Sequence, residues 1–380
     1  MYVVAETYEN SAPLFRLHAL DLSTGREKMN GPVTIQASVA GDGDGSLNGE
    51  ITLDTTQHLQ RPGLLLANGA VYIAFGSVRD RFPYHGWIVA FNASDITKQK
   101  AVFNDTPDGG NGGVWQSGRG LAADGAGNVY AISGNGDYDG FLNFGESVIK
   151  LTPDLRVIDW FAPADWQDMS DVDLDLGSLG PVLVPGTDLV IGGDKADNLY
   201  VVNGGNMGHL GTSDAANPQV FQPITGGGVF NVALWPRTAD SLLYIVEEGD
   251  WTGGFRLANG TMESSAFSQT TVTSDWPFQG MAISANGNNN GILWMTIGDH
   301  DFPDPPGALL AYDALDLTHL LWSSEMNGRR DRLGTFAKFA NPTVANGRVF
   351  VPTFSNALVV YGLLPPARGA CLPAPGRVAR

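Results

Sequence analysis

Short apolar segments recur along the chain, and a turn that contains glycine, often after asparagine, precedes many of them. Two clear copies are residues 71–75, which follow Asn68-Gly69, and residues 349–353, which follow Asn346-Gly347. Within the segments, apolar residues alternate or run continuously, as they do in half-buried or buried strands. The pattern predicts many short strands joined by tight turns, and its recurrence every few tens of residues indicates a repeat protein.

Seven of these segments are each followed by a second apolar segment, which gives seven pairs of predicted strands: 2–5 with 15–22, 71–75 with 87–91, 129–133 with 147–151, 189–192 with 199–203, 242–246 with 255–257, 292–297 with 309–312, and 349–353 with 358–361. Most pairs have a further apolar segment before them, as at 63–66, and several have one after them, as at 100–103. Four antiparallel strands per repeat are typical of a β-propeller blade. We therefore predict an all-β propeller of seven recognisable four-stranded blades; a sandwich or a solenoid is the alternative architecture.

The two ends of the chain are expected to differ from the rest. Residues 1–364 are predicted to form the propeller, and the Pro/Gly-rich residues 365–380 a disordered tail. The first repeat has no innermost strand and the last has no outermost strand, so we expect open sheet edges that favour self-association. The N-terminus begins as a strand and shows no signal-peptide layout.

Composition narrows the choice of partners. The 49 glycines and 22 prolines suit a protein with many turns. A formal net charge of −18 argues against nucleic acid and anionic membranes as partners, so we expect a small-molecule ligand or substrate. The one cysteine, Cys371, excludes an intrachain disulfide and a metal cluster of several thiolates.

Residues 18–25 contain Asp21, Thr24 and Gly25 in an Asp-x-x-Thr-Gly turn, and residues 90–95 and 311–316 are degenerate copies, the second followed by Trp322. This pattern resembles the quinoprotein-like propeller repeat of enzymes that use pyrroloquinoline quinone (PQQ). Residues 61–66, 84–87, 113–118, 173–178 and 206–209 are similar to segments of a bacterial protein group with that fold. Because that group is longer at the N-terminus, the resemblance implies that this chain is a fragment of an eight-bladed ring.

The resemblance also implies a bacterial protein outside the cytoplasm, periplasmic or secreted. It brings PQQ into consideration as a cofactor, but PQQ enzymes commonly stack the quinone on a disulfide between adjacent cysteines, and their calcium-binding pattern is not evident in this sequence. Cofactor-free relatives of the fold serve as scaffolds and binding proteins.

Polar residues gather in two sets of loops that a propeller places on one face. The loops that lead into the innermost strands contain Arg61, Trp115, Gln116, Gln279, Lys338 and residues 171–175, and the loops that join the two middle strands contain Lys195 and residues 79–85, 137–139, 247–250 and 299–301. Loops on a rigid scaffold are where sites are built. We predict that Arg61, His85, Lys195 and Lys338 are catalytic, that Trp115 and Gln116 bind the substrate, and that these residues converge near the ring axis.

Two acidic segments are candidate metal sites. Asp171, Asp173 and Asp175 alternate, so an extended segment would point all three the same way. Such carboxylates need a divalent ion such as Ca²⁺, or a partner such as Lys195 or Lys338; the alternative is a solvated loop with an aspartate capping a turn. Residues 299–301, with Asp299, His300 and Asp301, offer nitrogen and oxygen ligands suited to Zn²⁺ or Mn²⁺, or else form an exposed loop.

His85 precedes a predicted strand and could act as a base or a ligand if Asp80 oriented it. The alternative is a structural hydrogen bond to nearby backbone.

Three functions remain open on the sequence alone. The first is a metal-dependent hydrolase of esters, lactones or phosphoesters, in which a divalent ion activates water. The second is a PQQ-dependent dehydrogenase of alcohols or sugars, and the third is a binding or scaffold propeller without catalysis.

Overall fold

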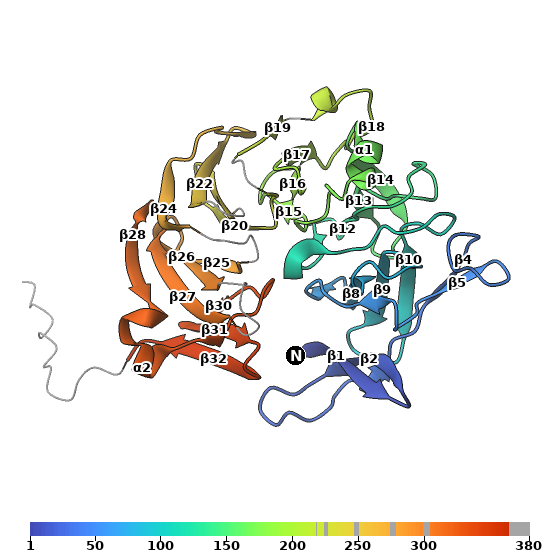
Figure 1. Cartoon of the computed structure of the whole chain (residues 1–380), viewed down its shortest axis with the longest axis horizontal. Coiled ribbons are helices and arrows are strands. Elements are labelled where there is room, and N and C mark those ends of the chain that lie inside the picture. Colours follow the sequence, from blue (N-terminus) through green and yellow to red (C-terminus); the bar gives the residue numbers. More distant parts are fainter. Residues whose placement is uncertain (218, 224–226, 247–250, 274–278, 299–304, 365–380) are drawn as a thin grey trace, which may run out of the picture.

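Seven antiparallel sheets follow one another around a ring in the computed structural model of the chain (Figure 1). The structure describes residues 1–217, 219–223, 227–246, 251–273, 279–298 and 305–364. Each sheet is a blade of a β-propeller, so the predicted all-β propeller with seven blades is confirmed and the sandwich and solenoid alternatives are excluded.

The blades in the first half of the ring are built from consecutive segments of the chain. Blade 1 contains β1 (Tyr2–Glu9), β2 (Ala12–Ala19) and β3 (Val33–Thr34). Blade 2 contains β7 (Leu65–Ala67), β8 (Ala70–Ser77), β9 (Trp87–Asn92) and β10 (Gln99–Asn104), with β6 (His58–Leu59) added to β8. Blade 3 contains β11 (Ala122–Ala123), β12 (Val129–Ile132), β13 (Val148–Leu151) and β14 (Val157–Ala162), with β18 (His209–Leu210) parallel to β14.

The second half repeats the arrangement. Blade 4 contains β15 (Val182–Leu183), β16 (Leu189–Gly193), β17 (Leu199–Asn203) and β19 (Gln219–Phe221). Blade 5 contains β20 (Asn231–Pro236), β21 (Ser241–Val246), β22 (Trp251–Ala258), β23 (Thr261–Met262) and β24 (Ser268–Thr273). Blade 6 contains β25 (Met281–Asn286), β26 (Asn289–Gly298), β27 (Pro306–Asp313), β28 (Asp316–Ser323) and β29 (Gly334–Thr335), and blade 7 contains β30 (Thr343–Ala345), β31 (Arg348–Thr353) and β32 (Ala357–Gly362).

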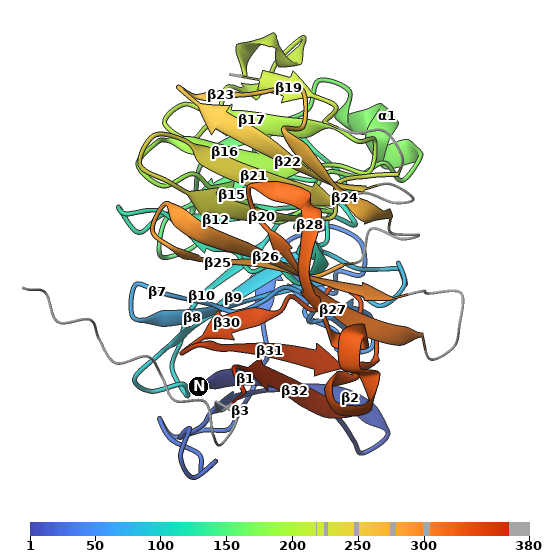
Figure 2. The same ribbon diagram turned by 90° about the vertical axis from the view of Figure 1, so that its left-hand side faces the viewer.

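A few short elements lie outside this plan. A hairpin of β4 (Ser38–Ala40) and β5 (Glu50–Thr52) projects at the outer edge of the ring (Figure 1). The helices are α1 (Trp166–Asp171), α2 (Gly328–Asp331), and the 3₁₀ turns η1 (Gln116–Gly118), η2 (Asp214–Ala216) and η3 (Ser324–Asn327). The side view places α1 at the edge of the disc (Figure 2), on the face that Figure 1 shows. No helix in the described part of the chain is long and apolar enough to cross a membrane.

The asparagine–glycine turns identified in the sequence set the register of two blades. Asn68 and Gly69 have φ values of 53° and 65°, and they join β7 to β8 with Ala67 paired to Ala70. Asn346 and Gly347, with φ of 51° and 71°, join β30 to β31 in the same way. Two consecutive residues with positive φ give a two-residue turn whose twist matches that of the strands, and asparagine and glycine adopt this conformation at low cost.

Six buried apolar clusters lie between neighbouring blades, from the pair 1 and 2 to the pair 6 and 7. β8 shows how they form, because successive side chains of a strand point to opposite faces of its sheet. Its Val71, Ile73 and Phe75 are buried against blade 1, whereas its Ala70 and Tyr72 are buried against blade 3. The middle strands are therefore apolar at nearly every position, which is the pattern that the sequence displays.

Blades 1 and 7 differ from the others in having three strands, as predicted. None of the clusters formed by described residues joins these two blades, although they are neighbours in the ring (Figure 1). Val349 and Val351 of β31 are buried against blade 6, but Leu358 and Val360 of β32 are 61% and 45% exposed. One face of blade 7 is consequently an exposed apolar surface, next to a strand edge that is unpaired within the described residues.

This surface predicts concentration-dependent self-association, because an apolar face with an open strand edge invites pairing with another chain. The double substitution Leu358→Lys and Val360→Lys should shift the protein toward monomer in sedimentation velocity experiments. Ile158→Lys, which places a charge at an exposed apolar position of β14, is the control and should leave the oligomer distribution unchanged. A wild-type chain that stays monomeric at high concentration would contradict the prediction.

Candidate functional site

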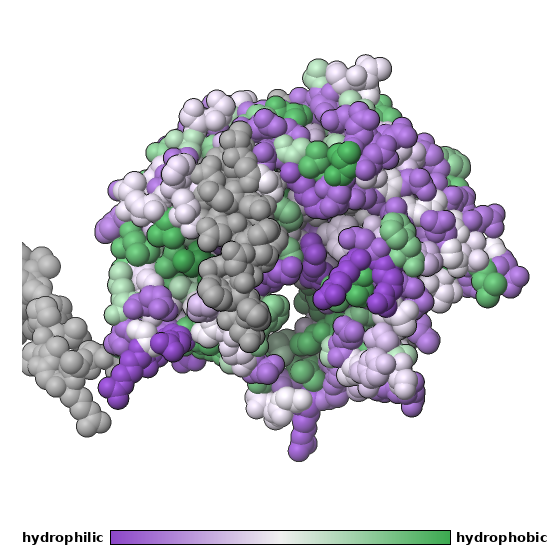
Figure 3. Space-filling view, in the orientation of Figure 1, coloured by the Kyte–Doolittle hydropathy of each residue, from purple (hydrophilic) through white to green (hydrophobic). Residues whose placement is uncertain are grey.

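Loops from blades 2, 3 and 7 meet near the centre of the ring, where the space-filling view shows an opening with hydrophilic residues along one side (Figure 3). Arg61 precedes β7, Trp115 precedes β11, and Phe339 precedes β30. The guanidinium of Arg61 lies 5.2 Å from the Trp115 ring centroid and 4.4 Å from that of Phe339. Its Nε also donates a hydrogen bond to the Trp115 carbonyl oxygen at 3.3 Å. Three blades thus contribute to one cation–aromatic contact.

A second group of charges lies on the blade 4 side of this contact. The Lys195 ammonium, in the loop between β16 and β17, lies 2.7 Å from Asp173 Oδ1 and also contacts Asp175 Oδ1. Asp173 is exposed and accepts a further hydrogen bond from Asn135 Nδ2 at 2.9 Å, whereas Asp175 is buried. The predicted pairing of Asp173 and Asp175 with Lys195 is therefore present in the structure.

Burial and charge compete within this group. Burial raises the pKa of Asp175 to about 6, although Lys195 opposes that shift. Burial alone would lower the pKa of Lys195 and raise the pKa of Asp173. The ion pairs outweigh burial, so the pKa of Lys195 is raised and the pKa of Asp173 is lowered. At neutral pH the lysine is positive and both aspartates are negative.

Glycine at position 134 allows Trp115 and Asp175 to approach each other. A Cβ built on Gly134 would lie 2.7 Å from Asp175 Oδ2 and 2.9 Å from Trp115 Nε1. Because real Cβ atoms do not approach other heavy atoms so closely, Gly134 fills the space between the indole and the carboxylate. The Arg61–Trp115 contact and the Asp175–Lys195 pair therefore both lie against Gly134, and we call these four residues, together with Asp173, Lys338 and Phe339, the central site.

Lys338 belongs to the cationic part of the central site. Its ammonium lies 5.3 Å from the centroid of the Phe339 ring, which also carries Arg61. Burial of the ammonium, and then the nearby charges of Arg61 and Arg79, lower the pKa of Lys338. Burial likewise lowers the pKa of Arg61 to about 10, although Asp175 and Asp80 oppose the shift. Arg61 and Lys338, both placed against the Phe339 ring, bring positive charge together within an acidic protein.

Two residues of this region were not identified from the sequence. Buried Glu146 accepts a hydrogen bond from the Leu176 backbone N–H at 2.7 Å and so holds the segment that carries Asp175. Burial, followed by the charge of Asp175, raises the pKa of Glu146 well above its usual range. Phe339 has a φ of 63°, in the left-handed region, and no sequence pattern predicts this conformation for a phenylalanine. Both residues lie in irregular segments, where periodicity gives no signal.

The structure gives structural roles to His85 and Gln116. His85 is buried, its Nδ1 lies 2.9 Å from Thr106 Oγ1, and its Nε2 lies 2.8 Å from the Asp44 carbonyl oxygen. The predicted partner Asp80 makes neither contact, and neither ring nitrogen is left to act as a base. Gln116 is also fully buried, and its side chain bonds the Ile132 N–H and the Arg119 carbonyl. These two hydrogen bonds support η1.

The expected alignment of three aspartates is wrong, because the segment is not extended. Asp171 is the last residue of α1, and Asp173 has a φ of 61°. No three His, Cys, Asp or Glu side chains among the described residues are arranged to hold a metal ion. The carboxylates of Asp173 and Asp175 instead share the ammonium of Lys195. Asp299, His300 and Asp301 lie outside the described residues.

The 3₁₀ turn η1 also connects opposite sides of the ring. Arg119, directly after η1, donates a hydrogen bond from its guanidinium to the Val232 carbonyl oxygen of blade 5. Gly118 lies so close to the Phe339 carbonyl of blade 7 that no side chain would fit at that position. Asn231 of blade 5 donates to Asn341 Oδ1, in the loop before blade 7, at 2.6 Å.

Comparisons with known proteins agree with the fold. The chain is similar to a quinohemoprotein alcohol dehydrogenase from Pseudomonas putida HK5, with a TM-score of 0.52 and 15% identity over 92% of this chain. It is also similar to a chain of the mitotic checkpoint complex, with a TM-score of 0.53 and 10% identity over 95% of this chain and 86% of that one. The WD40 domain of Toxoplasma gondii coronin gives a TM-score of 0.50 and 8% identity, over 83% of this chain and 69% of that one.

These likenesses show a β-propeller and, at such low identity, nothing finer. The chain spans 60% of the length of the dehydrogenase. No protein-family profile and no curated protein matches the chain. The β-propeller fold is thus supported by these structures, whereas activity and cofactor have to be argued from the central site itself.

The contact at Gly134 predicts that Gly134→Ala destabilises the protein. The added methyl group would collide with Trp115 and Asp175, and overpacking of this kind costs about 1–3 kcal/mol in the free energy of unfolding. Urea denaturation should detect this loss. Gly125→Ala is the matched control on the same blade, because a Cβ on Gly125 meets no atom within 4 Å. Equal stability of the two variants would contradict the packing described for the central site.

Asp105, in the buried network behind His85, predicts a dependence of stability on pH. Burial raises its pKa to about 7 from an ordinary value of 3.8, so the folded state holds a proton that the unfolded state has released. The contribution of this group to stability is present at low pH and is lost as pH rises from about 4 to 7.

Asp105→Asn, which cannot titrate, should therefore gain stability relative to wild type over that pH range, by at most about 1.4 kcal/mol per pH unit. Chemical denaturation at pH 4.5, 6 and 7.5 would measure the difference. Asp154→Asn, at an exposed aspartate, controls for the change in net charge. A wild-type to Asp105→Asn difference that is constant with pH would refute the raised pKa.

Proposed function

We propose that this protein is a ligand-binding propeller whose central site captures a small molecule that carries carboxylate or phosphate groups. The observation that carries the proposal is the position of Arg61, with its guanidinium against the Trp115 and Phe339 rings and Lys338 on the same Phe339 ring. Among the described residues, the Arg61 guanidinium makes one hydrogen bond, from Nε, so its two terminal nitrogens can donate to an anion.

The second group of charges would orient the ligand. Asp173 and Asp175 neutralise Lys195, so this part of the central site is polar without a large net charge. A ligand with an anionic end and a polar, hydrogen-bonding body would place the former at Arg61 and Lys338 and the latter at Asp173 and Asn135. Loops from several rigid blades hold these groups in place before the ligand arrives, which favours affinity.

The other functions expected from the sequence have less support. A metal-dependent hydrolase of esters, lactones or phosphoesters needs a metal site and a base; among the described residues no three His, Cys, Asp or Glu side chains are grouped to hold a metal ion, and both ring nitrogens of His85, the base expected from the sequence, already have partners. For a PQQ-dependent dehydrogenase, Arg61 and Lys338 are the residues that would hold the carboxylates of PQQ, and the quinone would supply oxidation chemistry. Cys371 is the one cysteine in the sequence, so the quinone would have to be held without the usual pair of adjacent cysteines.

The proposal also covers location and partners. An extracytoplasmic location, suggested by the likeness to quinoprotein enzymes, can be checked by fractionating the producing cells. The net charge of −18 supports a small ligand over nucleic acid.

Isothermal titration calorimetry with PQQ, citrate and inorganic phosphate, each as a separate probe, tests the proposed function. At least one of them should bind, and Arg61→Gln should weaken that binding about tenfold through the loss of a charge-assisted hydrogen bond. Arg26→Gln, which removes the same charge at an exposed position, should leave the affinity unchanged. If none of the three binds at millimolar concentration, or if both variants bind equally well, the proposal is wrong.

A further inference from the structure

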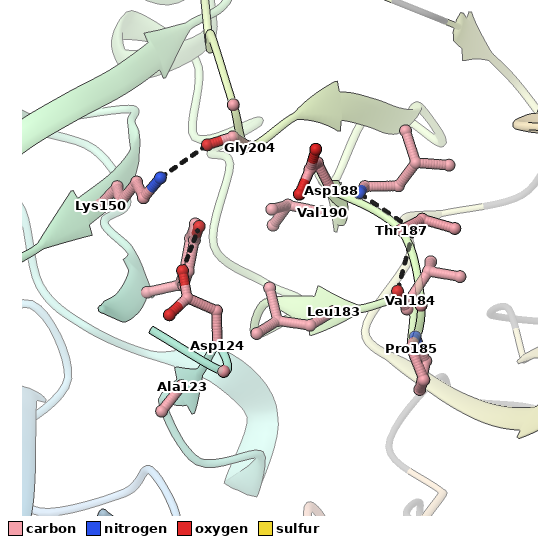
Figure 4. A pocket seen from close by; sticks show the side chains of 15 residues that line it. Ala123, Asp124, Lys150, Leu183, Val184, Pro185, Thr187, Asp188, Val190 and Gly204 are labelled. Carbon is pink, nitrogen blue, oxygen red and sulfur yellow. Dashed lines mark hydrogen bonds between the residues drawn. The ribbon is translucent and has the colours of Figure 1, made fainter. Parts of the chain in front are cut away.

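A cleft of about 340 Å³ lies between blades 3 and 4, at the opposite ends of the strands from the central site. It is bordered by the turn between β11 and β12, which contains Asp124, and by the turn between β15 and β16, which contains Asp188 (Figure 4). Lys195 follows the far end of β16, so the two sites lie on different faces of the ring. Clefts of this volume are large enough for small organic ligands.

Carboxylates face this cleft from two sides. Asp124 accepts hydrogen bonds from the Ala126 and Asn128 backbone N–H groups and, at 3.2 Å, from the Tyr130 hydroxyl, and these bonds fix its orientation. Asp188 is exposed, and its carboxylate makes no hydrogen bond or ion pair within the part of the chain that the structure describes. Asp188 therefore has its full hydrogen-bonding capacity available to a ligand.

The charges on these groups make the cleft negative. Burial raises the pKa of Tyr130, and the charges of Asp124 and Asp188 raise it further, so both carboxylates act on the same phenol inside the cleft. Lys150 offsets part of this potential, but its ammonium already donates to the Gly204 carbonyl oxygen at 2.8 Å and lies 5.7 Å from the Tyr130 ring centroid. Two carboxylates against one engaged ammonium leave a net negative charge.

The remaining walls of the cleft are apolar. Leu183 and Val190 line it from blade 4, and Ala123 lines it from blade 3 (Figure 4). Leu183 and Ala123 are half-buried and so present apolar surface to the cleft, whereas Val190 is almost fully buried behind them. An apolar wall beside a negative rim matches a ligand that has a cationic end and a hydrophobic body, because each part finds its own kind of surface.

We infer that this cleft is a binding site for a small organic cation, a primary ammonium that carries a short apolar or aromatic group. The ammonium would pair with Asp188 under the influence of Asp124, and the apolar group would pack on Leu183 and Ala123. The site is independent of the central site, which takes an anion on the other face.

Three probes of similar size test the inference by calorimetry: phenethylamine, the zwitterion phenylalanine, and the anion 3-phenylpropanoate. Phenethylamine should bind most tightly and 3-phenylpropanoate most weakly. If phenethylamine does not bind at millimolar concentration, the inference is wrong. Equal or tighter binding of phenylalanine or 3-phenylpropanoate would also overturn it, because Lys150 would then be recognising a carboxylate.

Two variants then locate the site. Asp188→Asn should weaken phenethylamine binding about tenfold, whereas Asp154→Asn, an exposed aspartate of blade 3 that does not line the cleft, should leave it unchanged. Ala123→Leu should fill the cleft and abolish binding without changing the affinity of the central site for its anion. Unchanged phenethylamine affinity in either Asp188→Asn or Ala123→Leu would place the amine elsewhere and refute the assignment.

Discussion

Packing between neighbouring blades is the interaction on which the rest of this structure depends. A middle strand such as β8 buries alternate side chains against two different neighbours, and each fully buried Val, Ile or Phe stabilises the fold by about 1.5–3 kcal/mol. Because every sheet between blades 1 and 7 is covered on both faces, the strand ends are fixed in space. The loops that leave those ends can then be polar and irregular without destabilising the ring.

The central site uses this rigidity to hold like charges near one another. A cation that is partly removed from water needs a compensating contact, and the structure provides two different kinds. Lys195 has carboxylates, whereas Arg61 has aromatic faces, which attract a cation without neutralising it. The carboxylates neutralise the charge of Lys195, but the aromatic rings leave the positive charge of Arg61 in place. This difference explains why the two halves of the site suit different parts of a ligand.

The sequence predicted the blades well because the features that define them are local. Asn68-Gly69 and Asn346-Gly347 specify turns by their own conformational preferences, and the apolar segments after them specify buried strands. Membership of the central site could also be foreseen for Arg61, Trp115 and Lys195, since their loops share one face. Which side chains contact one another within the central site was harder to predict, because these contacts depend on how the blades pack.

The segment from Asp171 to Asp175 shows the limit of local patterns. The alternating aspartates suggested an extended strand. Instead, Asp171 ends α1 and Asp173 has a positive φ, so only Asp173 and Asp175 contact Lys195. The surroundings of His85 were missed for a related reason, because its ring nitrogens contact the Asp44 carbonyl and the Thr106 hydroxyl, in residues that sequence position does not connect with it. Burial, which decides the role of a polar residue, is set by the whole ring.

The contacts that η1 makes across the ring have a mechanical consequence. No apolar cluster of described residues joins blades 7 and 1. If each blade contacted only its neighbours, these two blades could separate and the ring could open between them. Arg119 ties blade 3 to blade 5, and Asn231 ties blade 5 to the loop before blade 7. These hydrogen bonds run across the ring, so a force that separates blades 7 and 1 is also resisted by blades 3 and 5. Such cross-bracing lets the ring keep its shape without depending on closure between blades 7 and 1.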